Sequence, residues 1–526
     1  MSAAIDKNGK RGDDENAVPT QSNRLSAVVI KTGHKSMRFL LDTNILLPLE
    51  DSKLLLQPSL ANFVRLANAH GHELLYHPAS EDDIRQDRDV DRRNQTLHRL
   101  SQYSRLPTRP PCTWNEGVSN RNDAADNEIL YALELNAAHA LVTEDQGIHG
   151  KARAKGLVQR VYTIQTADDL LRRLHEQQTV SLPNIEDLPL YSLTPYLNTQ
   201  FFDSLREGYG GFNDWFAKKA QAGRNAWVNW ERPNMLGGIC IYDRQVNEQI
   251  TDDITLAGPA LKLATFKVGD TNRGKKVGEL FLKMAFRHAT LNRLENIFIH
   301  GDEDQHRFLF EMLEDFGFTH VGSHPGSNGR DAVYLKPHPV EPPPDDLPPF
   351  DYSCRFFPHF RHDAAVSNYI VPIQPGYHRI LFPDYPSPLD RQLTLFQQPN
   401  TAGNAIKLAY LCHAQTQHIE PGSTVLFYRS RDERALTSIG VVERYETLRD
   451  AAAIVSQVKR RTVYSMDEIS EMATKPTRVM LFRLVRHFEN PLSQAWLEQS
   501  GALRGAPQSI TQISHEKFEQ ILAHGR

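Results

Sequence analysis

The stretch MRFLLDTNILLPL, residues 37–49, decides how the first part of this chain is interpreted. Residues 37–41 form an apolar run typical of a buried strand, and Asp42 follows it directly, ahead of a second apolar run with helical character. The same succession recurs in ELLYHPASEDDI, residues 73–84, and in HALVTEDQGI, residues 139–148. Strands that alternate with helices predict a parallel sheet whose ligand sites lie beyond the carboxyl ends of its strands.

Four acidic residues are expected to converge at that edge of the sheet. Three of them follow the apolar strands, and the fourth lies on the amphipathic helix predicted in NDAADNEILYALEL, residues 122–135, where Asp123 shares its face. The four are Asp42, Asp83, Asp126 and Asp145. Carboxylates gathered in this way repel one another unless a hard divalent cation such as Mg²⁺ or Mn²⁺ neutralises them, and such a cation can activate water against a phosphodiester.

The alternative for each acid is a purely structural role. Every one of them also stands where a helix begins, and a carboxylate is favoured there for capping and dipole reasons alone. Ser80 and Asp83, for example, fit a capping box.

Taken together and in this order, the motifs LLDTNILL, DAADNEIL and LVTED resemble the PIN domain family over residues 37–175. The resemblance implies a three-layer α/β/α fold, metal-dependent endoribonuclease activity and frequent service as toxins of toxin–antitoxin pairs. Its acidic quartet, catalytic and metal-binding, falls on Asp42, Asp83, Asp126 and Asp145. Asn44 and Thr143 match residues that flank the quartet, Asp123 is an extra acid that can replace or assist Asp126, and Asp83 stands where Glu is commoner.

A second block, residues 191–338, carries a cationic helix start. Residues 235–245 and 260–268 predict paired strands, and an amphipathic helix is expected to begin near Lys275. The residues Arg273, Gly274, Lys275 and Lys276 crowd its amino terminus, where free N–H groups and the dipole favour an anion. Cations there lower stability unless a negative ligand binds, which predicts a phosphate-bearing cofactor. The alternative is a solvated basic turn.

This block resembles the GNAT acyltransferases, since RGKKVG supplies Arg273 and Gly278 of the family motif, with Lys276 in place of its middle glycine. The resemblance implies acetyl-CoA bound with its pyrophosphate on the backbone amides of residues 273–278. It also implies that the pantetheine arm pairs with the strand ending at Val268.

The catalytic groups of this second block are left open. The tyrosine that protonates the leaving thiolate in many GNAT enzymes would fall on Leu313, ahead of Phe318, and leucine cannot donate a proton. Either another group or water takes that role, or the block binds acyl-CoA without efficient turnover. Glu248 and Asp253 lie near the expected place of a general base, with surface charge as the alternative for each.

A third block, residues 351–526, contains many short strand candidates, a helix expected at 448–458, and another in SHEKFEQIL. The mixture predicts a small β-barrel with a few helices. The segment PGSTVLFYRSRDERALTSIGVVE, residues 421–443, resembles the PUA-like group, which includes ASCH and EVE modules and commonly binds RNA or modified bases. Candidate RNA contacts are Tyr377, Arg429, Arg431, Lys459, Arg460 and Arg461, with core packing or a solvated face as the alternative.

Length and composition bound these interpretations. A chain of 526 residues accommodates three to four domains, and 60 Lys and Arg against 64 Asp and Glu exclude a uniformly basic nucleic-acid coat protein. Residues 1–36 are expected to be a disordered tail, residues 176–190 a linker, and residues 339–350, which contain EPPPDDLPPF, a Pro-rich linker.

The sequence also predicts where the protein works. It has no membrane-length apolar run and no secretion signal, so a cytoplasmic protein without a membrane partner is expected. Its four cysteines are Cys112, Cys240, Cys354 and Cys412, and they show no zinc spacing. They are expected to be buried or free thiols, which suits a reducing compartment.

The predicted fold class is therefore multidomain α/β: a PIN-like α/β/α parallel sheet, a GNAT-like α+β mixed sheet and a PUA-like small β-barrel with helices. The leading functional hypothesis is an RNA-directed bifunctional enzyme that cleaves RNA with Mg²⁺ or Mn²⁺, transfers an acetyl group from acetyl-CoA and recognises RNA with its last block. A toxin or defence role with an antitoxin partner follows from family habit alone. Two alternatives stand beside it: an acyl-CoA-sensing, RNA-binding regulator with neither site proficient, and an acetyltransferase alone, acting on a protein or a small amine.

Overall fold

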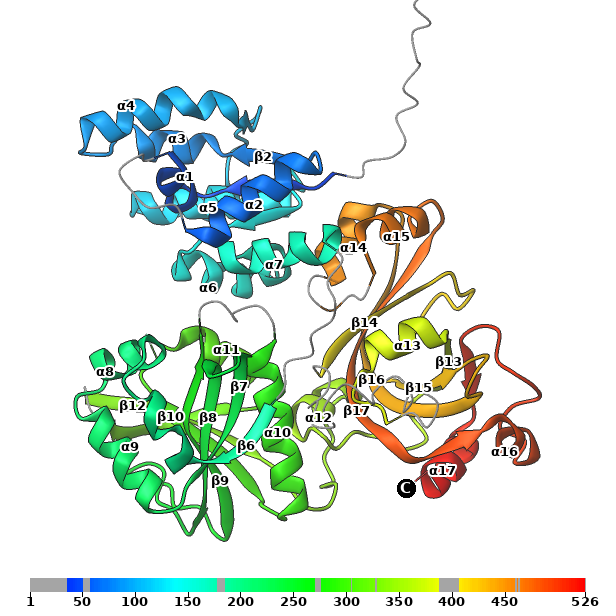
Figure 1. The fold of residues 1–526 in the computed structure, drawn as a ribbon. Helices are drawn as coiled ribbons and strands as arrows, with labels where there is room; N and C mark the ends of the chain where they lie inside the picture. Colours follow the sequence, from blue (N-terminus) through cyan, green and yellow to red (C-terminus); the bar gives the residue numbers. More distant parts are fainter. Residues whose placement is uncertain are drawn as a thin grey trace, which may run out of the picture.

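The computed structural model describes residues 36–50, 57–176, 185–269, 276–303, 305–326, 329–386, 406–458, 461 and 464–525. Within these residues the strands form three sheets, one parallel and two mixed, in a multidomain α/β arrangement (Figure 1). The tail expected at residues 1–36 lies outside the described residues, apart from Ser36. No helix in the described ranges is long and apolar enough to cross a membrane.

The first block is built on a parallel sheet with the strand order β3-β2-β1-β4-β5. Phe39 and Leu41 pack into one apolar cluster with the helices α2 and α7, whereas Leu40 packs into another with α5 and α6, so helices cover both faces. The elements are β1 (Arg38–Leu41), α1 (Thr43–Glu50), α2 (Pro58–Ala69), β2 (Glu73–Tyr76), α3 (Pro78–Ile84), α4 (Val90–Arg99), β3 (Ser104–Arg105), α5 (Arg121–Glu134), β4 (Ala140–Val142), α6 (Gln146–Ala154), β5 (Val161–Tyr162) and α7 (Ile164–His175).

The middle block has a mixed sheet with the order β11-β12-β10-β9-β8-β7-β6, in which β9 and β10 are parallel neighbours. Helices α10 and α11 pack on one face, and α8 and α9 pack on the other. The elements are β6 (Ile185–Pro189), α8 (Asp203–Gly208), α9 (Phe212–Gln221), β7 (Asn225–Arg232), β8 (Met235–Val246), β9 (Pro259–Val268), α10 (Val277–Leu291), β10 (Asn296–Gly301), α11 (Arg307–Glu314), β11 (Thr319–Gly326) and β12 (Gly329–Pro337). The linker expected at 176–190 is therefore too long, because Ile185–Pro189 pairs with β7 as an edge strand.

The third block has a mixed sheet with the order β14-β17-β16-β15-β13-β18. Its elements are α12 (Pro349–Arg355), β13 (Asn368–Ile373), α13 (Pro375–Leu381), β14 (Lys407–Cys412), β15 (Thr424–Arg429), β16 (Ala435–Leu448), α14 (Ala451–Val458), α15 (Met466–Met472), β17 (Thr477–Ser493), α16 (Gln494–Gln499), β18 (Thr511–Ile513) and α17 (His515–His524). Among the described strands β14 and β18 remain at opposite edges, so the sheet is open where a closed barrel was expected. Irregularities along β16 and β17 interrupt their register, which allows a long strand pair to bend.

The Pro-rich segment before the third block is fixed by contacts. Tyr352 donates its hydroxyl hydrogen bond to the Pro343 carbonyl at 2.8 Å, and the Arg361 guanidinium donates to the Leu347 carbonyl at 3.0 Å. Proline prevents this segment from forming a helix or a central strand, but its carbonyl groups remain acceptors. The expected spacer at 339–350 is thus packed along α12, and α12 itself begins inside it, at Pro349.

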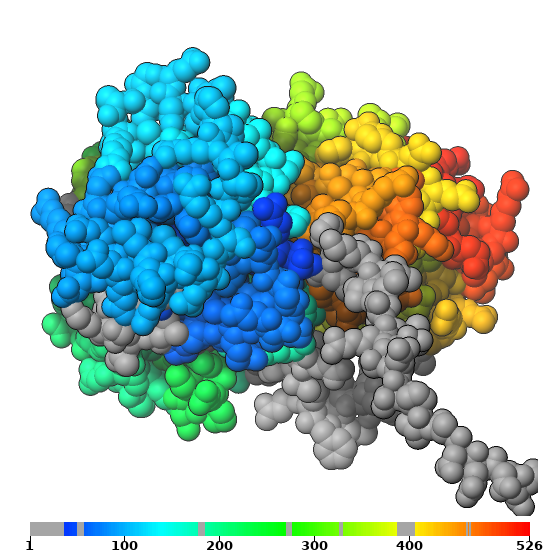
Figure 2. Space-filling model, turned by 90° about the horizontal axis from the view of Figure 1, so that it is seen from above, coloured from blue at the N-terminus to red at the C-terminus, as the bar shows by residue number. Residues whose placement is uncertain are grey.

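The three blocks share packing surfaces. Ile454 and Val455 of α14 belong to the same apolar core as Leu170 and Leu171 of α7, although the chain between them includes the whole middle block. Seen from above, the surface of the first block lies directly against that of the α14–α15 region (Figure 2). The middle block meets the first through Arg153, whose guanidinium lies 3.2 Å from the Glu314 carboxylate.

Candidate functional sites

The first candidate site lies where β1 and β4 end. Leu41 pairs with Val142, so the residues that follow, Asp42 and Thr143, meet at the edge of the sheet. Asp42 is only 6% exposed. It accepts hydrogen bonds from the Thr143 hydroxyl at 2.6 Å, the Asn44 side-chain amide at 2.8 Å and the Thr43 backbone N–H at 2.7 Å. Asn44 and Thr143 therefore hold the Asp42 carboxylate in a fixed orientation.

The electrostatics of these carboxyl groups indicate that they lie near one another. Burial raises the pKa of Asp42 to about 6, against the hydrogen bonds of Thr143 and Thr43, and the charges of Asp126 and Asp145 raise it further. Burial also raises the pKa of Asp126, whose neighbours include Asp145. Burial raises the pKa of Asp83, the Arg121 guanidinium 3.8 Å away opposes this rise, and the charge of Asp126 adds to it. Asp42 is thus close enough to Asp126 and Asp145 for their charges to act on it, and Asp83 is close enough to Asp126.

Lys151 on α6 provides a cation inside this group that the sequence pattern did not indicate. Its ammonium donates to Asp123 Oδ1 and to Asp126 Oδ2, both at 2.9 Å. Asp145 accepts a hydrogen bond from the Ile148 backbone N–H at 3.0 Å and so caps α6. This is the capping role that was the structural alternative for that acid. Within the described ranges no three His, Cys, Asp or Glu side chains are grouped closely enough to hold a metal ion. KARAKG resembles any solvated helix end, so only the fold reveals this contact.

The second candidate site is an opening between β9 and β10. The two strands pair in parallel from Ala260–Asn296 to Leu263–Ile299. Beyond that point β9 continues against β8, as far as the pair Gly238–Val268, while β10 continues against β12. In the part of the chain that the structure describes, residues 264–268 therefore have a ladder on one side only. An open strand edge of this kind can pair with an extended ligand.

A bulge marks the point where the strands diverge. Tyr242 of β8 lies opposite Leu263, and the preceding Ile241 lies opposite Thr265, so Ala264 is an extra residue in β9. A bulged residue is left out of the regular ladder. Ala264 therefore presents its backbone groups at the start of the opening.

Helix α10 begins beside this opening, at Val277. A Cβ atom added at Gly278 would lie 3.2 Å from the end of the Met312 side chain and 3.6 Å from Phe266. Gly278 thus faces the space between α11 and the outer half of β9. Arg273, Gly274 and Lys275 of the predicted phosphate cradle lie outside the described residues. Val268, the predicted pantetheine partner, is the last residue of β9.

Lys276 differs from its predicted role. Its ammonium donates to the backbone carbonyl of Lys407 in the third block and lies 4.0 Å from Glu279. Glu279 in turn accepts from the Lys407 backbone N–H. One turn later Lys283 donates to Asp384 at 2.7 Å. These residues lie on one stripe of α10, so the stripe binds the third block and directs the Lys276 side chain there.

The other residues considered for acyl transfer are buried in the core, paired with a cation or exposed. Leu313 is completely buried in the core beneath α10, as its apolar side chain requires. Glu248 lies 3.5 Å from the Lys262 ammonium, on the half of β9 that pairs with β10. Asp253 is exposed. None of these groups provides a proton donor at the opening.

The predicted RNA contacts are largely structural. Arg429 is 0% exposed and lies 2.6 Å from Asp432, so it corrects the expectation of a nucleic-acid contact: a buried guanidinium requires a carboxylate partner. Arg461 is buried against Glu443 at 3.0 Å. Tyr377 donates to Glu468 at 2.9 Å, and burial together with that carboxylate raises the pKa of Tyr377 to about 12. Arg431 is exposed, and Lys459 and Arg460 lie outside the described residues.

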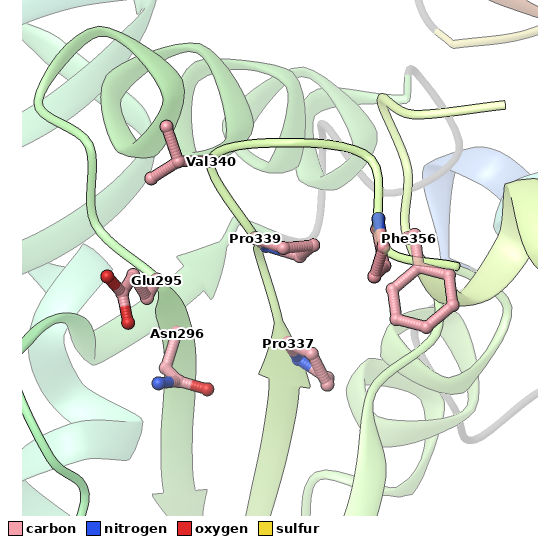
Figure 3. Close-up of a pocket in the computed structure, with 7 residues that line it drawn as sticks. Glu295, Asn296, Pro337, Pro339, Val340 and Phe356 are labelled. Carbon is pink, nitrogen blue, oxygen red and sulfur yellow. The ribbon is translucent and has the colours of Figure 1, made fainter. Parts of the chain in front are cut away.

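A surface pocket of about 500 Å³ lies elsewhere, at the start of β10 and the end of β12 (Figure 3). Its lining consists of Glu295, Asn296, Pro337, Pro339, Val340, Pro343 and Phe356. The opening next to β9 is at the other end of β10. The pocket therefore contains none of the residues predicted for catalysis or binding.

Comparisons with known proteins give partial structural likenesses. No protein-family model matches the sequence, and no curated protein matches it. Among solved structures, ASCH from Zymomonas mobilis is 13% identical over 30% of this chain and 94% of its own, with a TM-score of 0.23. A putative GNAT acetyltransferase from Desulfovibrio desulfuricans is 11% identical over 29% of this chain and 97% of its own, with a TM-score of 0.24. An aminoglycoside 6'-N-acetyltransferase complexed with coenzyme A is 17% identical over 31% of this chain and 99% of its own, with a TM-score of 0.23.

Proposed function

We propose that this chain is an acyl-CoA-dependent N-acyltransferase that uses its middle block. The observation that carries the proposal is the opening between β9 and β10, with the first turn of α10 beside it. Extended amides such as those of pantetheine can pair with the one-sided backbone of residues 264–268. The free N–H groups at the start of α10 suit the pyrophosphate of the same ligand.

The reaction proposed for this site is transfer of an acetyl group to an amine. Bound acetyl-CoA supplies the activated acyl group. The diverging strands orient the thioester, and the bulged Ala264 offers a backbone group to the carbonyl oxygen, where negative charge develops in the transition state.

Gly278→Val is expected to weaken acetyl-CoA binding by at least about tenfold, the equivalent of 1.4 kcal/mol. The added side chain fills the space between Met312 and Phe266, and the flexible end of Met312 can move aside, so the fold is retained. Isothermal titration calorimetry of the full chain with acetyl-CoA measures the effect. Gly505→Val, at a glycine with nothing within 4 Å of an added Cβ, is the matched control. Equal affinities for Gly278→Val and wild type would contradict the proposed site.

A second candidate function is metal-dependent cleavage of RNA by the first block. The specific observation in its favour is the buried Asp42 carboxyl group, whose raised pKa reflects both burial and the nearby acids Asp126 and Asp145. Carboxylate oxygens suit Mg²⁺ or Mn²⁺, and an ion held by them would supply an activated water for attack on the phosphodiester. In the described residues the acids are not grouped closely enough to hold such an ion, so they would have to move together. Lys151 holds Asp126 in the described structure, so Asp126 must exchange this partner before it can join Asp42 at one cation. We also propose that the third block contributes RNA contacts, with Arg431 as its exposed candidate.

An acyl-CoA-sensing regulator remains the alternative to the transferase. It would use the same opening but would release no free thiol from acetyl-CoA. Measuring both binding and thiol release with a set of primary amines separates the two. A toxin role and an antitoxin partner stay predictions.

A further inference from the structure

Two side chains form a hydrogen-bonded pair at the end of β10. Tyr209, in the turn between α8 and α9, has its hydroxyl 3.0 Å from His306 Nε2, just before α11. A Cβ atom added at Gly301, the last residue of β10, would lie 3.5 Å from the His306 ring and 4.0 Å from the Tyr209 hydroxyl. The pair therefore lies where β10 has already left β9.

The contacts of the pair place it near the opening. Tyr209 packs into the same apolar cluster as the bulged Ala264. The charge of Lys267, on the one-sided stretch of β9, acts on the His306 ring. The Lys267 ammonium is held by the Ser204 hydroxyl and lies 5.2 Å from the centre of the Phe201 ring. The hydroxyl and the imidazole thus lie beside the end of β10, near the start of the opening.

The pair has the protonation states that a proton relay needs at neutral pH. Burial raises the pKa of Tyr209, and the charges of Asp331 and Asp302 add to it, while a hydrogen bond from the Asp302 backbone amide opposes it. Burial lowers the pKa of His306 against the charges of Asp302 and Asp331, and Lys267 lowers it further. Tyr209 is consequently protonated and His306 neutral, so the tyrosine can give a proton and the imidazole can take one.

The position of the pair also indicates which group could donate the proton that Leu313 cannot donate. His306 and Leu313 are seven residues apart, close to two helical turns, and so lie on the same side of α11. Leu313 is buried in the core, whereas His306 is half-buried at the start of that side and contacts the Tyr209 hydroxyl. A proton donor is therefore present, but it is Tyr209 of the α8–α9 turn, which is paired with His306 at the start of α11.

We propose that Tyr209 and His306 are the proton-transfer pair of the acyl transfer, an inference that rests on the function proposed above. The acceptor nitrogen bonds to the acetyl carbon, and the bond between that carbon and the CoA sulfur breaks. The leaving thiolate takes the Tyr209 hydroxyl proton. His306 takes, through water, the proton lost by the acceptor nitrogen and passes it to Tyr209, which restores the pair.

Tyr209→Phe and His306→Gln are expected to lower kcat for free-thiol release by about 100-fold, the usual contribution of a positioned acid or base. Acetyl-CoA and a set of primary amines that includes spermidine serve as substrates for the full-length chain. The Kd for acetyl-CoA and the thermal unfolding midpoint should stay at their wild-type values, because the hydroxyl takes part in the transition state and not in ligand binding. Tyr191→Phe is the control, since Tyr191 belongs to the same block and is 64% exposed.

The outcomes separate this inference from the function it rests on. A chain that does not bind acetyl-CoA would overturn the proposed transferase itself. A wild-type chain that turns over, together with a Tyr209→Phe variant of equal kcat, would overturn only the role of the pair. A chain that binds acetyl-CoA and releases no thiol with any amine would also overturn it, and would favour the acyl-CoA-sensing alternative. A rise in the Kd for acetyl-CoA, or a fall in the unfolding midpoint, that accompanies the loss of kcat would assign the pair a structural role.

Discussion

Asp42→Asn is expected to abolish Mn²⁺-dependent RNA cleavage, with a loss of at least about 1000-fold, because it removes the charge of the most buried acid in the group. Total cellular RNA incubated with the purified chain, with and without Mn²⁺, and resolved on a gel gives the measurement. Asp91→Asn is the matched control, since Asp91 is an exposed acid on α4 of the same block. RNA that remains intact with the wild-type chain under every metal condition would reject the nuclease proposal.

The Asp42→Asn variant can also be tested by its stability, which does not depend on activity. The folded-state pKa of Asp42, about 6, is above its ordinary value of 3.8, so the folded state binds the proton more tightly than the unfolded state does. The stability that this carboxyl group contributes is complete below about pH 3.8 and is lost as pH rises through about 6. By the usual conversion the loss amounts to roughly 3 kcal/mol.

We therefore expect Mn²⁺ to raise the unfolding midpoint of the wild-type chain at pH 7.5 and to leave that of Asp42→Asn unchanged. A cation that binds the folded state restores the stability lost through Asp42 ionisation. In the absence of metal, the wild-type midpoint should fall between pH 4 and pH 7 by more than that of the variant. Equal Mn²⁺ shifts in both proteins would show that the ion binds elsewhere.

Glu443→Gln is expected to lower the free energy of unfolding by about 3–5 kcal/mol, because it leaves buried cations without their carboxylate. Burial alone would raise the pKa of Glu443, but Arg461, Lys407 and Arg483 hold it at about 2. The cluster also joins two blocks, since Arg483 donates to the Asp315 carbonyl at 2.7 Å and Lys407 lies 2.9 Å from the Asp315 carboxylate. A break at Glu443 should therefore loosen the middle block from the third.

Thermal denaturation of the full chain measures this effect, with an expected fall in the midpoint of about 6–20 °C for a block of this size. Glu489→Gln is the control, because Glu489 is exposed on β17. Since the folded-state pKa of Glu443 is depressed from 4.5 to about 2, its contribution is present above about pH 4.5 and is lost as pH falls toward 2. The difference between wild type and variant should narrow over that range. A midpoint shift no larger than that of Glu489→Gln would contradict the role of the cluster.

Local sequence patterns predicted many of the elements because the determinants are local. The apolar run before Asp42 forms β1, the segment at 260–268 forms β9, and the helix expected near Lys275 begins at Val277. Strand alternation with helices also predicted the parallel sheet, and that sheet explains why Asp42 meets Thr143 across two neighbouring strand ends. Composition and hydrophobic periodicity depend on residues that are close in the sequence, so they can be recognised from the sequence alone.

The errors concern burial, which depends on how the whole chain packs. Arg429 was expected on an RNA-binding surface but is buried beside Asp432, and the Pro-rich segment was expected to act as a spacer but packs along α12. In both cases the sequence shows residue types typical of a surface, and burial depends on which chain segments fold over them. The sharing of one apolar core by α7 and α14 was equally inaccessible, since no local pattern records a partner hundreds of residues away.

The sequence by itself determined many of the strands and helices, the acids that end the first sheet, and the absence of a proton donor at Leu313. Only the tertiary structure decided that Lys151 lies between Asp123 and Asp126, that β10 leaves β9 beyond Leu263, and that Tyr209 meets His306. The physical reason is the range of the interactions. Propensity and hydrophobic periodicity are properties of neighbouring residues, whereas an ion pair, a strand opening or a hydrogen bond between loops exists only after the whole chain has packed.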